Sequence, residues 1–70
     1  MVEVFKTNVP SQTQANSILI SLQKNFPAHK INFDLDDCDK VLRVQGRNIS
    51  TKKVIVLVNK NGYDCEILGY

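Results

Sequence analysis

The sequence predicts a small α+β fold whose segments follow the order strand, helix, strand, strand, an ambiguous segment, strand. Three observations indicate this order. Several short stretches alternate apolar and polar residues, residues 11–26 repeat their apolar side chains at helical spacing, and turn-forming residues separate these segments. The chain has 70 residues, 43% of them hydrophobic, which is enough for one core but not for two. We therefore expect a single domain over residues 1–70.

The first strand is expected over residues 2–6, where β-branched and aromatic side chains dominate. After a break at residues 7–10, apolar residues recur three and four positions apart and form one stripe, as in a helix that covers a core. The stripe consists of Ala15, Ile18, Leu19, Leu22 and Phe26. Pro27 is expected to end this helix.

The start of this helix carries two local signals. Ser11 followed three residues later by Gln14 is the pattern of a capping box, in which each side chain satisfies a free backbone N–H group. Val9 and Ala15 stand where a hydrophobic staple forms. An alternative for Ser11 and Gln14 is a polar recognition surface at an exposed helix start.

A β-hairpin is expected next. Residues 30–35 alternate apolar and polar side chains, the acidic cluster at 36–39 reads as a turn, and residues 42–45 alternate again before Gly46. In the second of these strands Arg43 and Gln45 face away from the core. That outer face lacks the aromatic pair with which open sheets of this kind bind RNA, so the RNA-binding interpretation is weak.

The following segment is ambiguous on local grounds. Residues 54–58 are mostly β-branched and favour a strand. Three signals favour a helix, namely a possible cap at Ser50, a possible staple of Ile49 with Val54, and Gly62 just past the end. The margin is narrow, because lysines in the first turn oppose the helix dipole. A last strand is expected over residues 63–68, with its odd-numbered residues on one face.

Composition excludes several functions. Nine basic residues are interleaved with seven acidic ones for a net charge of +2, with no basic run, so we expect no nucleic-acid partner. The longest apolar run, residues 54–58, is far too short to span a bilayer, and the first residues lack a signal-peptide pattern, so we expect a cytoplasmic protein without membrane insertion. With one histidine and no catalytic motif, we expect no enzyme activity and no cofactor.

In order and spacing, the whole chain resembles the heavy-metal-associated domains of copper chaperones and metal-pumping ATPases. The resemblance lies in four segments, which are Phe5-Lys6-Thr7-Asn8-Val9, then Ile18 with Ser21-Leu22, then Asp39-Lys40-Val41-Leu42-Arg43-Val44, and finally Gly62-Tyr63. It implies a ferredoxin-like βαββαβ sandwich, a four-stranded antiparallel sheet with two helices on one face. It also makes the ambiguous segment a helix over residues 50–61.

One departure from the family pattern bears directly on function. Members of this family bind soft metal ions through Cys-x-x-Cys at the end of the first loop, and the resemblance maps those two positions onto Ser11 and Gln14. Cu(I) and Zn(II) sites of that kind depend on thiolate donors, and a hydroxyl and a carboxamide supply neither charge nor softness. The resemblance therefore implies a family-like scaffold without the family's high-affinity metal site.

Two functional hypotheses follow. The first is a protein-binding or adaptor module, a monomer or weak homodimer, whose contact surface is formed by Asn8, Val9, Ser11, Gln14 and Tyr63. The second is residual soft-metal binding or transport through Cys38, Cys65 or both. A reduced pair with a half-buried structural Cys65 is the simpler interpretation of these thiols, because the family topology places them toward different edges of the sheet.

Overall fold

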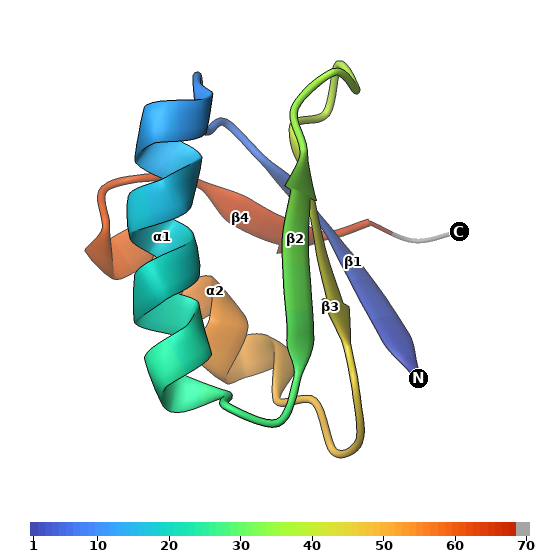
Figure 1. The fold of residues 1–70 in the computed structure, drawn as a ribbon. Helices are drawn as coiled ribbons and strands as arrows, with labels where there is room; N and C mark the ends of the chain where they lie inside the picture. The colour runs from blue at the N-terminus through green and yellow to red at the C-terminus, as the bar shows by residue number, and fades with distance from the viewer. Residues whose placement is uncertain (69–70) are drawn as a thin grey trace.

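A four-stranded antiparallel sheet is covered on one face by two helices in the computed structural model, which describes residues 1–68 (Figure 1). The elements in chain order are β1 Val2–Thr7, α1 Gln12–Asn25, β2 Lys30–Asp34, β3 Val41–Gln45, α2 Thr51–Lys60 and β4 Cys65–Ile67. The strand order is β2-β3-β1-β4. The predicted fold class is confirmed, and the ambiguous segment is the helix α2.

The register of the sheet sorts the side chains between its two faces. Phe5 of β1 lies opposite Leu42 of β3 and opposite Ile67 of β4, so these residues share the face that the helices cover. Phe5 and Leu42 are fully buried together with Ile18 and Leu22 of α1. The predicted helical stripe therefore contributes to the core, except for Leu19, which stays partly exposed.

Helix α2 forms in a segment whose β-branched residues favour a strand, and both of its ends are capped. Its N-terminus is capped as predicted, because the Ser50 hydroxyl accepts a hydrogen bond from the Lys53 N–H at 3.3 Å. At its C-terminus the Gly62 N–H reaches the Asn59 carbonyl at 2.9 Å and the Tyr63 N–H reaches the Val58 carbonyl at 3.3 Å. This pair of bonds is a Schellman motif. Its left-handed residue is Gly62, with φ +94°.

The last strand is shorter than the predicted range 63–68, because β4 comprises only Cys65–Ile67. The Asp64 N–H, which would have extended the pairing with β1, donates instead to the Asn8 side chain at 2.8 Å. The Tyr63 N–H is engaged at the end of α2. Ile67 shares the helix-covered face but stays 51% exposed at the sheet margin, so the predicted apolar face of this strand is only partly buried.

Within residues 1–68, neither helix combines the length and the apolar character that crossing a membrane requires.

The end of the molecule opposite the α1 start is held by His29. Its Nε2 atom lies 2.8 Å from the Arg47 carbonyl oxygen, and its ring packs edge-on against Phe26 with centroids 5.4 Å apart. Gly46 passes beneath the ring so closely that a Cβ atom there would lie 2.4 Å from His29 Cδ2. The residue that closes β3 therefore has to lack a side chain for the imidazole to reach its partner.

We predict that Gly46→Ala destabilises the fold by about 1–3 kcal/mol, because the added methyl group collides with a ring held in place by a hydrogen bond. Urea denaturation of the variant measures this loss. The matched control is the same substitution in a His29→Ala background, where the collision is gone and the cost of Gly46→Ala should fall by about 1 kcal/mol or more. Equal costs in both backgrounds would contradict the explanation.

Candidate functional site

The end of the sheet where β1 passes into α1 is organised by Thr7, the last residue of β1. Its side chain is 6% exposed. Its N–H donates to the Asp39 carbonyl at 3.0 Å, its hydroxyl donates to the Lys40 carbonyl, and the same hydroxyl accepts from the Val9 N–H at 3.3 Å. One residue thus ties the β1–α1 loop to the hairpin turn between β2 and β3.

Asn8 ties the same loop to the segment between α2 and β4. Its side-chain amide donates to the Asp64 carboxylate at 3.1 Å, and its carbonyl oxygen accepts from the Asp64 N–H at 2.8 Å. Sequence reasoning did not single out Asp64, because no local pattern relates two residues so far apart in the chain. The family-like placement of Tyr63 beside the loop was the available signal, since Asp64 follows it directly.

The capping box predicted for Ser11 and Gln14 does not form. Ser11 is the N-cap residue of α1, but its hydroxyl makes no bond to a backbone N–H of the first turn and donates instead to the Gln14 carboxamide oxygen. In a capping box the Gln14 oxygen would accept a hydrogen bond from the Ser11 backbone N–H. Here it accepts one from the Ser11 hydroxyl. The helix begins without a side-chain cap on its backbone, and Val9 and Ala15, both fully buried, hold its first turn against the core.

Of the five predicted contact residues, the structure joins Ser11 to Gln14 directly and buries Val9. Asn8 and Ser11 are exposed, while Gln14 and Tyr63 are partly buried. Asn8 is joined to the residue after Tyr63, and Ser11 is joined to Gln14. Val9 is fully buried in the core, so its side chain cannot contact a partner and does not belong to the surface.

An open pocket of about 260 Å³ lies between the end of β1 and the start of β4. Asn8 and Asp64 close one side through their reciprocal hydrogen bonds. Lys6 pairs with Asp39 across the sheet at 3.8 Å, and both side chains are substantially exposed. The residues that line the pocket are Lys6, Thr7, Asn8, Asp64, Cys65 and Glu66.

Cys65 occupies this pocket as a half-buried thiol that packs against the core, as predicted for a structural cysteine. Burial, and to a lesser extent the neighbouring Glu66 carboxylate, raise the pKa of the Cys65 thiol from 9.0 to about 12. Metal ligation and nucleophilic attack both need the thiolate. The environment of Cys65 therefore disfavours both at neutral pH.

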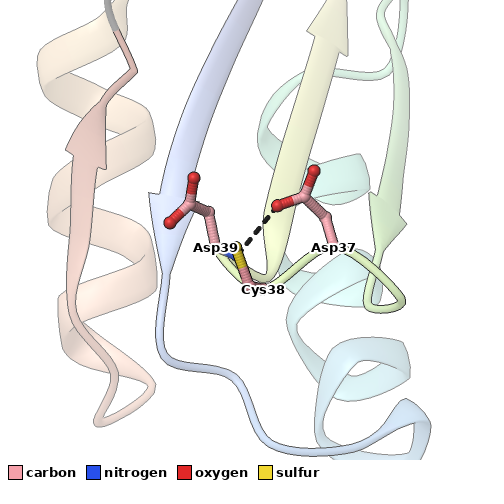
Figure 2. Close-up of side chains that lie close together, drawn as sticks. All are labelled: Asp37, Cys38 and Asp39. Atoms are coloured by element: carbon pink, nitrogen blue, oxygen red, sulfur yellow. Dashed lines mark hydrogen bonds between the residues drawn. The ribbon is translucent and has the colours of Figure 1, made fainter.

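Cys38 lies on the exposed hairpin turn between the Asp37 and Asp39 carboxylates (Figure 2). One possible ligand atom from each of these three residues lies within 4.8 Å of the others. Asp37 accepts a hydrogen bond from the Asp39 N–H at 2.9 Å, which holds the turn, and Asp39 is engaged with Lys6. Among the described residues, Cys65 takes part in no such cluster, so the two thiols are not brought into one site of this kind.

Comparison with known proteins supports the architecture. Among solved structures, the chain is similar to a yeast copper transporter domain, CCC2A, determined in solution in its apo and Cu(I)-loaded states, with a TM-score of 0.80 and 17% sequence identity over 97% of this chain and 94% of that one. The chain has the fold of a heavy-metal-associated domain. At this identity the similarity concerns the fold alone. The sequence matches no model of a known protein family and no curated protein.

Within this heavy-metal-associated fold, the start of α1 carries no thiol. The chain's two cysteines, Cys38 and Cys65, lie on the hairpin turn and on β4. What stands at the start of α1 is a hydroxyl bonded to a carboxamide, a neutral polar surface whose neighbours are tied down by Thr7 and Asn8. Such a surface offers hydrogen-bond donors and acceptors in fixed positions, but no soft ligand.

We predict that iodoacetamide modifies Cys38 much faster than Cys65 in the folded protein at about pH 8.5, because the high pKa and partial burial of Cys65 leave almost no accessible thiolate. Peptide mapping by mass spectrometry measures both rates. In urea the two rates should converge, and in the variant Cys38→Ser the folded protein should label only slowly. Equal labelling of both thiols in the folded state would contradict the assignment.

Proposed function

We propose that this chain is a small non-enzymatic binding module, built on the heavy-metal-associated fold, that recognises a protein partner and does not bind metal with high affinity. The observation that carries the proposal is the start of α1. There, Ser11 bonds to Gln14 at the position where the family resemblance implies a pair of metal-binding thiols. The proposed contact surface comprises Asn8, Ser11, Gln14 and Tyr63, with Asp64 added and Val9 left out.

Rigidity of the loop supports a role in recognition. A loop whose backbone and side chains are already bonded to two other segments loses little conformational entropy when a partner binds. Thr7 fastens it to the hairpin turn, and Asn8 fastens it to Asp64. Ser11 and Asn8 are both exposed residues, so a partner can reach their side chains.

The second candidate function is metal binding at the hairpin turn. The proximity of Cys38 to the carboxylates of Asp37 and Asp39 favours it. Against it, the site offers a single thiolate, and both carboxylates already have partners in the chain. One soft donor among hard ones suits Cu(I) poorly. We therefore place this function second.

We predict that the reduced protein retains neither Cu(I) nor Zn(II) against a competing chelator, as measured by native mass spectrometry. The double variant S11C/Q14C should gain one Cu(I) ion, because it restores two thiols at a helix N-terminus, where thiolates are stabilised. The variant S11A/Q14A is the matched control and should gain none. Metal retained by the unmodified protein but lost in Cys38→Ser would favour the second candidate function instead.

The partner surface is tested by photo-crosslinking in cells. A photoreactive residue at Ser11 should capture a protein that is also captured from Asp64, because both positions belong to the proposed surface. The control position is Lys53, an exposed residue in the first turn of α2. If Lys53 captures the same proteins with equal yield, the α1 start is not a specific recognition surface.

A further inference from the structure

The outer edge of β2 is the longer of the two free edges of the sheet. In the strand order β2-β3-β1-β4, β2 and β4 are the end strands, with five and three residues. In Figure 1, β2 is the strand nearest the viewer, and no described segment pairs with its outer side. An unpaired edge of this length presents backbone donors and acceptors that another strand can pair with.

Side chains of this chain form hydrogen bonds to the backbone just before β2 and just after it, but not to the backbone of β2 itself. Gln23 donates to the His29 carbonyl at 2.9 Å just before β2, and Lys40 donates to the Leu35 carbonyl at 3.1 Å just after it. Between these two points, no side chain among residues 1–68 bonds to the backbone of Lys30–Asp34. The free stretch therefore coincides with β2 itself.

We infer that β2 is a self-association surface and that its occupant is β2 of a second copy of this chain, paired antiparallel about a two-fold axis at Asn32. The sequence of β2, Lys-Ile-Asn-Phe-Asp, is complementary to itself in this register. Lys30 of each copy lies opposite Asp34 of the other, and Ile31 lies opposite Phe33. Both types of pair are favourable across neighbouring strands.

The faces of β2 agree with this pairing. Lys30, Asn32 and Asp34 lie opposite Gln45, Arg43 and Val41 of β3, on the face away from the helices. Among the described residues, Lys30 and Asp34 take part in no ion pair, so both charges are available. A shift by two residues in one direction places Lys30 opposite Asn32 and loses both charge pairs. A shift in the other direction places Lys30 opposite Asp36, which lies beyond the end of β2 in the hairpin turn, so only the register centred on Asn32 forms both charge pairs within the strands.

The helix-side residues of β2 supply the apolar part of the contact. Ile31 and Phe33 lie opposite the fully buried Val44 and Leu42, yet they are only half-buried themselves because no strand covers their outer side. A second copy of β2 would cover that side and extend the sheet to eight strands. Since the two β2 strands run in opposite directions, the two α1 starts would lie at opposite ends of the joined sheet, free for other partners.

Charge reversal tests both the surface and its register. Sedimentation equilibrium from micromolar to millimolar concentration should show a reversible monomer–dimer equilibrium for the unmodified chain. Lys30→Asp or Asp34→Lys alone places like charges opposite each other twice per dimer and should weaken dimerisation at least about tenfold. The double swap K30D/D34K restores both pairs and should return the dissociation constant to within about threefold of the original.

Mixing gives a second readout of the same register. The variants K30D and D34K, each weakened alone, should form a heterodimer when combined in equal amounts, because every charge then faces its opposite. The matched control is Lys53→Asp, which should leave the dissociation constant unchanged. Circular dichroism checks the folding of each variant. If a single variant fails to fold, the double swap, which keeps the amino-acid composition of β2, decides the test.

Two results would overturn the inference. One is an unmodified chain that stays monomeric at millimolar concentration. The other is a dimer whose dissociation constant does not respond to the single charge reversals, which would place the interface elsewhere. Neither result bears on the surface at the start of α1, because β2 contributes none of its residues.

Discussion

The hydrogen bonds of Thr7 are the constraint on which the rest of the site depends. Three segments come together at this end of the molecule, namely the loop to α1, the hairpin turn and the start of β4. The Thr7 backbone and hydroxyl bind the first two together, and its register with Cys65 aligns the third. Because Thr7 is buried, these bonds are shielded from competing water, and losing the hydroxyl would leave buried polar groups unpaired. The positions of Asn8 and Ser11 follow from where Thr7 holds the chain.

Local sequence patterns were sufficient for most of the fold. The helical stripe of α1, the hairpin of β2 and β3, and the caps of α2 each arise from neighbours in the chain, so periodicity and capping residues predict them. Helix α2 is the instructive case. Its β-branched residues favour a strand, and only the burial of Val54 and Val58 together with the end signals at Ser50 and Gly62 makes the helix the better state.

The details of the site could not be predicted from local sequence patterns, because they depend on contacts between distant residues and on the path of the folded chain. The bonds between Asn8 and Asp64 join residues far apart in sequence, and they also shorten β4 by using a donor that pairing would have needed. Ser11 and Gln14 have the spacing of a capping box, yet the hydroxyl finds the carboxamide oxygen instead of the backbone. Val9 was included in the contact surface because it belongs to the loop before α1, but its side chain is fully buried in the core.

The central position of β1 governs the order in which the fold is assembled during synthesis. Within these residues β1 leaves the ribosome first, yet its partners are β3 and β4, which come much later in the chain. Helix α1 and the β2–β3 hairpin involve near neighbours and can form early, whereas the pairing of β1 has to wait. Until then the side chain of Phe5 has no core to enter and is open to non-native contacts. A nascent chain of this protein is therefore expected to reach its native sheet only when its last strand has emerged.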